Sequence, residues 1–193
     1  EDGNATSRAI EILFTPLRAP KTTQPAILLS VGGLYPNGIT RSLQNLLKNL
    51  PEAEGPVQIF VPRSLFKNSQ PREMARELRE RANFTLHSGL RTGTRQEQFV
   101  WRKFMLRAGK FSRHNERGLR SRMQRECRLY FGDARLKVAI DFDGHFAAQA
   151  ALFGFGFEGN TKNIYVAHNE FRREMEMKFP AHRNIGETLR HYD

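Results

Sequence analysis

The sequence predicts an α/β protein with a Rossmann-like, mainly parallel sheet that carries helices on both faces. Short aliphatic runs that are typical of buried strands alternate with longer segments in which apolar residues recur at helical spacing. A glycine-rich turn joins the first such strand to the first helix. The chain has 193 residues, 39% of them hydrophobic, which is enough for one core.

The alternation defines one domain over residues 26–193, preceded by an extension or linker at residues 1–25. After the third strand, two basic helical segments follow each other without a strand between them, so we expect a helical insert at about 95–131. The expected strands lie at 26–29, 57–61, 84–87, 138–142 and 163–167. The expected helices lie at 39–50, 71–82, 95–108, 112–131, 146–153 and 170–177.

The turn after the first strand holds three glycines and an asparagine, Gly32, Gly33, Asn37 and Gly38. The first N–H groups of a helix lack intrahelical partners and carry the positive end of the helix dipole, so an anion bound there meets donors and favourable potential. The turn is therefore a candidate phosphate-binding loop, with Asn37 or Thr40 as the helix cap. A glycine-rich connection that serves only packing explains the pattern equally well, and the spacing fits neither a dinucleotide nor a triphosphate motif.

The positive charge of the chain is concentrated in one segment. The whole chain carries a net charge of +11, and residues 63–135 alone contain 19 Lys and Arg against seven Asp and Glu. Most of these cations are arginines, which bind phosphates through paired donors. Arg117, Arg120 and Arg125 of the second insert helix are the residues we expect to contact a polyanion or a membrane.

Ligands of open α/β sheets bind beyond the carboxyl ends of the strands, so polar residues at those ends are candidate site residues. The strand at 138 leads into Asp141, Asp143 and His145, and the strand at 163 leads into His168, Asn169 and Glu170. A histidine or carboxylate at such a position can act as a general base or hold substrate hydroxyls. The alternative is that these residues cap the following helices, a role that suits Asp143 and Asn169.

Other kinds of chemistry find little support in the sequence. The aspartates and histidines above have no metal-ligand spacing, and no G-x-S-x-G elbow of a serine hydrolase occurs. The single cysteine, Cys127, lies on the apolar side of an amphipathic helix, which favours packing over a nucleophilic role. We expect no cofactor and no metal ion.

Three stretches taken in order resemble a known family. Val31–Leu46, Ile140–Gly144 and Ile164–Asn169, with a closing Tyr-Asp pair, are similar to the N-terminal half of bacterial GT-B glycosyltransferases. The most similar members act in cell-surface polymer synthesis and occur with teichoic-acid-type glycerophosphotransferases. The resemblance covers the chain from about residue 26 to the end, and the segment 63–135 matches only in general character.

The resemblance implies a two-domain enzyme and a role for each group of candidate residues. Such enzymes have two Rossmann-like domains facing a cleft, and the N-terminal one binds the acceptor while the C-terminal one holds most of a nucleotide-activated sugar or alditol donor. Gly32, Gly33 and Gly38 would approach the donor phosphates, and Asp141, Asp143 and His168 would lie on the acceptor side. The donor-binding motif of the second domain has no counterpart here, so we expect this chain to be inactive alone.

The expected acceptor is an anionic polymer or a lipid-linked precursor, which places the protein in the cytoplasm. Contact with the inner face of the membrane is a further hypothesis, because residues 95–131 combine arginines with Phe99, Trp101, Phe104, Met105 and Phe111. The main rival function is nucleic-acid binding through the same arginines and aromatics, although no recognition module is present. A scaffolding domain that kept the fold and lost the reaction is the third reading.

Overall fold

A computed structural model describes residues 26–106, 112–132, 134–157, 159–168 and 183–193. The fold is α/β, with one sheet of five strands in the order β3-β2-β1-β4-β5. Every neighbouring pair is parallel, so the expected mainly parallel sheet is confirmed. The strands are β1 (Ala26–Ser30), β2 (Val57–Pro62), β3 (Asn83–His87), β4 (Leu136–Asp141) and β5 (Lys162–Tyr165).

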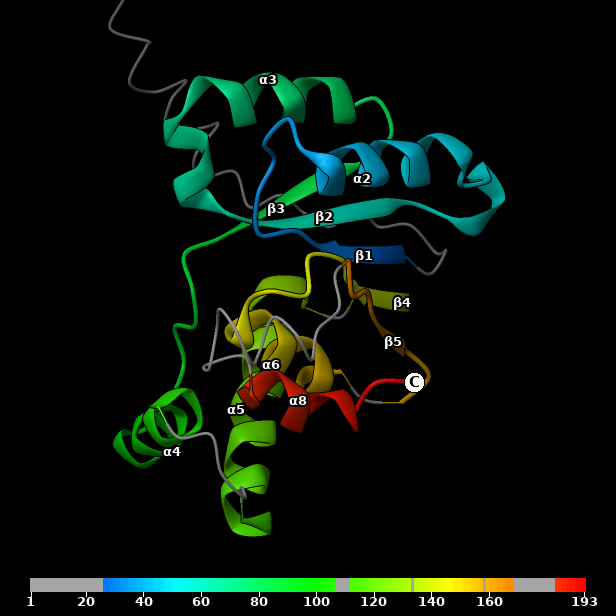
Figure 1. The fold of residues 1–193 in the computed structure, drawn as a ribbon. Coiled ribbons are helices and arrows are strands. Elements are labelled where there is room, and N and C mark those ends of the chain that lie inside the picture. The colour runs from blue at the N-terminus through cyan, green and yellow to red at the C-terminus, as the bar shows by residue number, and fades with distance from the viewer. Residues whose placement is uncertain (1–25, 107–111, 133, 158, 169–182) are drawn as a thin grey trace, which may run out of the picture.

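Helices cover both faces of this sheet, as the sequence predicted (Figure 1). One face carries α2 and α3, and the other carries α5, α6 and α8, with α4 packed on α5. The α-helices are α2 (Gly38–Asn49), α3 (Ser69–Leu78), α4 (Arg95–Leu106), α5 (Arg113–Phe131), α6 (Ala147–Gly156) and α8 (Arg183–Leu189). Two short 3₁₀ turns complete the described elements, η1 (Glu52–Glu54) and η2 (Arg63–Lys67).

Burial on both faces explains why the central strands are continuous apolar runs. All five residues of β1 are buried. Successive side chains of a strand point to opposite faces, so Ile27 and Leu29 enter the core under α2 and α3, whereas Leu28 enters the core under α5 and α6. Apolar burial of this kind contributes about 25 cal/mol per Å² and is the main stabilising term of the fold.

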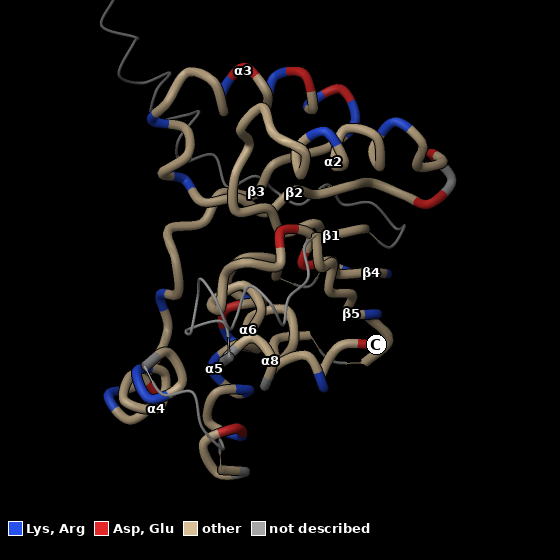
Figure 2. Tube along the Cα trace, viewed as in Figure 1, with Lys and Arg blue, Asp and Glu red and all other residues tan. Residues whose placement is uncertain are grey.

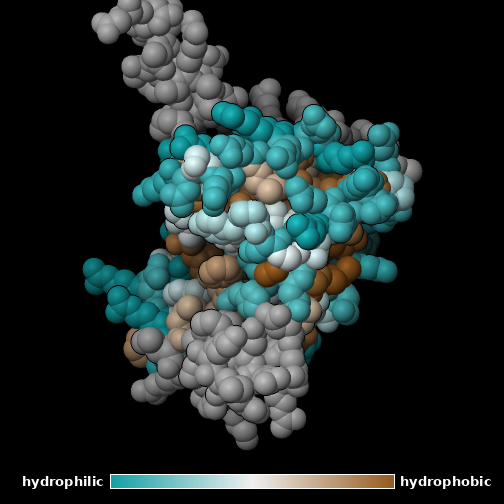
Figure 3. All heavy atoms as spheres, turned by 45° about the horizontal axis from the view of Figure 1, so that its top comes forward, coloured by the Kyte–Doolittle hydropathy of each residue, from teal (hydrophilic) through white to brown (hydrophobic). Residues whose placement is uncertain are grey.

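The outer face of the α2–α3 layer is largely hydrophilic (Figure 3). Each of these helices buries one stripe of apolar residues, among them Leu43 and Leu47 of α2 and Leu78 of α3. The remaining positions are mostly polar and exposed. The amphipathic pattern that predicted these helices therefore marks the face that packs on the sheet.

The basic helical insert is confirmed as α4 and α5, which follow β3 and precede β4. Figure 2 shows Lys and Arg spread along these helices. Helix α5 packs on α6 through small side chains, because a Cβ added to Gly156 would run into the sulfur of Cys127. The expected helix at 170–177, the apolar patch at 10–14 and the extension at 1–25 lie outside the described residues.

Candidate functional site

The site begins at the turn between β1 and α2, where Asn37 caps the helix. Its side-chain oxygen accepts a hydrogen bond from the Thr40 N–H at 3.0 Å, and its backbone is extended. The expected cap is therefore present, and it occupies one of the donors that an anion would have used. Gly38 is the first residue of α2 and has open space around the position of a Cβ.

Gly32 is required by close packing rather than by an unusual backbone angle. Its N–H donates to Asp143 Oδ2 at 2.8 Å, and an added Cβ would overlap the ring of Phe146. A Cβ on Gly33 would lie 3.1 Å from the ring of Tyr35. Neither glycine has a positive φ. The turn after β1 and the turn after β4 are thus bonded to each other, and Asp143 is the residue that joins them.

Asp141, the last residue of β4, is a buried carboxyl group. Its Oδ1 accepts from the Gly144 N–H at 3.3 Å, and the Tyr192 hydroxyl lies 3.5 Å from Oδ2. The pKa of Asp141 is raised to about 7, mainly by desolvation and also by the nearby charge of Asp143, while the Gly144 and Tyr192 contacts oppose the rise. A carboxyl group with such a pKa exchanges protons near neutrality, which is a property of catalytic acids and bases.

His168 lies three residues after β5 and is held by the turn that follows β4. Its Nε2 is 2.6 Å from the Phe142 carbonyl oxygen, and the two rings pack edge to face with centroids 5.0 Å apart. A carbonyl oxygen only accepts, so Nε2 carries the proton, and in the neutral ring Nδ1 keeps the lone pair. Within the described ranges no hydrogen bond to Nδ1 is formed, so this nitrogen is the one that could accept from a substrate hydroxyl.

The structure brings most of the expected residues to one edge of the sheet. Gly32, Asp141, Asp143 and His168 all lie at the carboxyl ends of β1, β4 and β5, and the half-buried His145 follows Asp143 in the same turn. Asn169 and Glu170 are outside the described residues. The capping role considered for Asp143 is not observed, because its carboxylate bonds to Gly32 on another strand end.

Two aromatic residues of the site were missed at the sequence level. The Tyr192 hydroxyl donates to the Ala150 carbonyl oxygen at 2.9 Å and approaches Asp141. The C-terminal segment therefore contacts the buried side of the site. Phe146 occupies the cap position of α6 without a side-chain hydrogen bond and leaves 47% of its surface exposed. An aromatic ring at a cap position is an unfavourable local choice, which is the sequence feature that could have drawn attention to it.

The three arginines expected to meet a polyanion differ in their surroundings. Arg117 is exposed, whereas Arg125 forms an ion pair with Glu97 at 2.5 Å, and Arg120 is 3.2 Å from the His191 ring. Contact of these arginines with a membrane or polyanion therefore stays a prediction. Arg117 is the most exposed of the three.

The aromatic residues of α4 are divided between the core and the surface. Phe104 is buried and stacks on Trp101, with ring centroids 5.4 Å apart, whereas Phe99 is exposed and lies under the Lys103 ammonium. Cys127 is buried, and desolvation raises the pKa of its thiol, which keeps it in the unreactive protonated form. The packing role expected for Cys127 agrees with its buried position.

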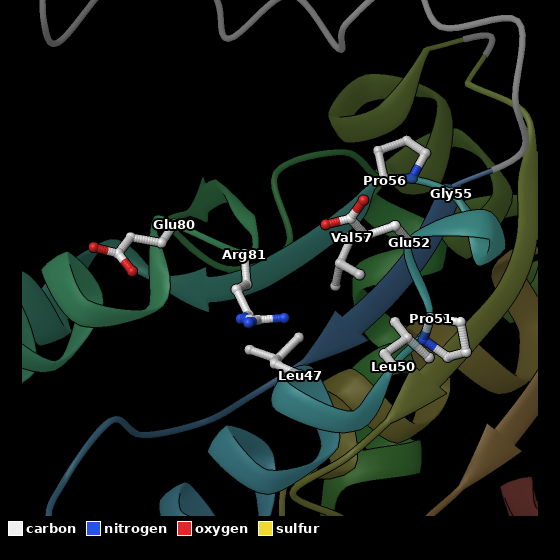
Figure 4. Close-up of a pocket in the computed structure, with 9 residues that line it drawn as sticks. All are labelled: Leu47, Leu50, Pro51, Glu52, Gly55, Pro56, Val57, Glu80 and Arg81. Carbon is white, nitrogen blue, oxygen red and sulfur yellow. The ribbon is translucent and has the colours of Figure 1, made fainter.

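A hollow of about 400 Å³ lies at the opposite edge of the sheet, beside the amino end of β2 (Figure 4). It is bounded by Leu47 of α2, by Leu50 at the C-terminal cap of that helix, by the η1 turn and by Glu80 and Arg81. Ligands of parallel sheets bind at the carboxyl ends, so this hollow is separate from the candidate site.

The described residues contain no group of three or more His, Cys, Asp or Glu side chains placed to hold a metal ion. None of the helices in the described ranges is long and apolar enough to cross a membrane. No protein-family model matches the sequence, and no curated protein matches it either. The fold and the geometry of the site are therefore the basis for any functional proposal.

Proposed function

We propose that this chain is the acceptor-binding half of a GT-B-type glycosyltransferase. The reaction would transfer a sugar or alditol phosphate from a nucleotide-activated donor to a cell-surface polymer or its precursor. The observation that carries the proposal is that an oriented histidine and a buried carboxyl group with a pKa of about 7 both lie at the carboxyl edge of a Rossmann-like sheet. Both groups belong to neighbouring strand ends, β4 and β5.

The chemistry assigns a separate task to each group. His168 Nδ1 accepts the proton of the attacking acceptor hydroxyl, and the Phe142 carbonyl stabilises the ring as it becomes positively charged. Asp141 is buried behind the turn that follows β4. Its carboxyl group would lie near the reacting groups and change its charge when it gains or loses a proton. Gly32, Gly33 and Gly38 form the wall that the donor phosphates would approach.

The donor would be shared with a second domain that faces this edge. Without it the chain would bind acceptor and fail to turn over nucleotide sugars. The acceptor would be anionic or lipid-linked, in keeping with the excess of Lys and Arg in residues 63–135. A cytoplasmic protein with a peripheral contact at the inner membrane face would meet such an acceptor, and exposed Arg117 would take part in that contact.

The test is the turnover of the complete transferase with His168→Ala. We expect the turnover number to fall by about 10²-fold or more, because a positioned general base contributes about that factor. The unfolding midpoint should change little. His114→Ala is the matched control, because His114 is exposed on α5 and distant in sequence from every strand end. Near-normal turnover of the His168 variant would refute the assignment.

A further inference from the structure

A second hollow lies at the carboxyl edge, above the ends of β2 and β3. Its volume is about 760 Å³, which is within the range of small-molecule sites. The last residues of the two strands, Pro62 and His87, line it together with residues of the η2 turn. The lining residues are Pro62, Arg63, Ser64, Phe66, Lys67, Leu86, His87, Ser88 and Gly89.

The charged side chains that line this hollow are both cationic. Arg63 and Lys67 are exposed on its rim, and the nine lining residues, all within the described part of the chain, include no Asp or Glu. Serine hydroxyls and backbone groups add neutral donors between the two cations. An anionic group fits this rim, and the pairing of Arg with Lys suits a phosphate.

The inner wall of the hollow is apolar. Pro62 and Phe66 line it, and Leu86 leaves 39% of its surface exposed there. An exposed leucine beside two half-buried apolar side chains gains free energy when a ligand removes it from water. The hollow therefore matches a ligand that carries an apolar portion next to its anion.

His87 is one of the lining residues, and its ring packs against Phe60 and Tyr130 on the α5 side of the sheet. Its ring stacks on Phe60 with centroids 4.2 Å apart, and desolvation lowers its pKa to about 4, so the ring is neutral at physiological pH. The Gly89 N–H donates to Nδ1 at 3.3 Å, which leaves the proton on Nε2. Nε2 is buried and has no acceptor among the residues that the structure describes.

The far wall is fixed before any ligand binds. The Tyr130 hydroxyl of α5 donates to the Gly89 carbonyl oxygen at 2.5 Å, and the Thr92 N–H donates to Glu126 of the same helix. The segment 88–92 is thus held along α5. A wall that is already ordered lowers the entropy cost of binding.

We propose that this hollow binds a phosphate ester with an apolar chain. Arg63 and Lys67 contact the phosphate, and Phe66 and Leu86 contact the chain. β3 and β4 are three strand spacings apart, about 14 Å at the usual separation, so only a ligand of at least that length anchored here would reach the turn after β4 that holds His168. Identifying this ligand with the transferase acceptor rests on the proposed function, whereas the binding itself does not.

The experiment titrates the ¹⁵N-labelled chain with octyl phosphate below its micelle concentration. We expect saturable shifts of the Ser64, Ser88 and Gly89 amides and of the His87 ring nitrogens. Arg63→Glu with Lys67→Glu should weaken binding at least tenfold. The control is Lys48→Glu with Arg79→Glu, which makes the same change of charge at the opposite end of the sheet and should alter affinity less than twofold.

Two further titrations separate the contribution of the phosphate to binding from that of the apolar chain. Inorganic phosphate and octanol should each bind at least tenfold more weakly than octyl phosphate. Equal binding of inorganic phosphate would overturn the role of the apolar wall. Shifts that appear elsewhere, no shifts, or equal weakening in the control variant would overturn the site. A failure here leaves the His168 turnover test unaffected, so the two proposals are judged separately.

Discussion

Replacing Asp141 with Asn tests how strongly the fold penalises a charge at the end of β4. The pKa of Asp141 is about 7 in the folded chain and 3.8 without the fold, so between these pH values the native state binds more protons than the unfolded state. The free energy of unfolding of the wild type therefore falls as pH rises through that window. At about 1.4 kcal/mol for each pH unit, the penalty at pH 7.5 reaches at most about 4 kcal/mol.

Asn keeps an oxygen for the Gly144 N–H and carries no charge, so it lacks this penalty. We expect the variant and the wild type to be equally stable near pH 4 and the variant to be more stable by about 2–4 kcal/mol at pH 7.5. Urea unfolding followed by circular dichroism at pH 4.5, 6 and 7.5 measures the difference. Ionisable groups that do not interact with Asp141 contribute equally in both proteins and cancel.

A matched control is Glu73→Gln, which removes an exposed carboxylate from α3 and should leave stability within about 0.5 kcal/mol at every pH. The reasoning is refuted if the difference between Asp141→Asn and wild type is the same at pH 4.5 and 7.5. That result would mean that the Asp141 carboxyl is solvated in the folded state. In the proposed transferase, the same variant should also lose the part of its pH–rate profile that lies near pH 7.

Two further predictions concern packing and buried charge. Gly32→Ala should destabilise by about 1–3 kcal/mol, because its Cβ overlaps the Phe146 ring, whereas Gly38→Ala should be neutral or stabilising by up to about 1 kcal/mol; equal unfolding midpoints for the two would contradict this. Arg122 is buried with Nε and Nη1 unpaired among the described residues, and its main charge partner is Glu126. Arg122→Met should cost about 3 kcal/mol and Arg122→Met with Glu126→Gln less than half of that, and additive effects in a double-mutant cycle would refute the coupling.

Local pattern predicted the five strands and helices α2 to α6, but it missed α8 (Arg183–Leu189) and was less accurate at the ends of the elements. All five strands lie where aliphatic runs predicted them, but β4 begins two residues earlier than expected and β5 ends at Tyr165 rather than at residue 167. Strand ends depend on which neighbour supplies hydrogen bonds. The Val166 N–H still donates to the Asp141 carbonyl oxygen although its residue has left the strand. The sequence alone does not contain that pairing.

The site was predicted in position more than in detail. Parallel strands place their carboxyl ends together, so locating polar residues after β1, β4 and β5 was enough to predict one shared edge. The contacts within that edge join residues far apart in the chain. Asp143 bonds to Gly32 across 111 positions, and Tyr192 approaches Asp141 across 51. Spacing rules act over a few residues and cannot reveal such pairs.

The sequence by itself determined the α/β class, the mainly parallel sheet, the basic helical insert and a helix cap at Asn37 or Thr40, because each follows from periodicity or from a side chain that reaches nearby backbone. Only the tertiary structure decided that Gly32 is required by the Phe146 ring, that Asp141 is buried enough to bind a proton near neutrality, and that His168 is oriented by the Phe142 carbonyl. Burial and orientation depend on which surfaces meet, and in a parallel sheet those surfaces come from strands separated by whole helices along the chain.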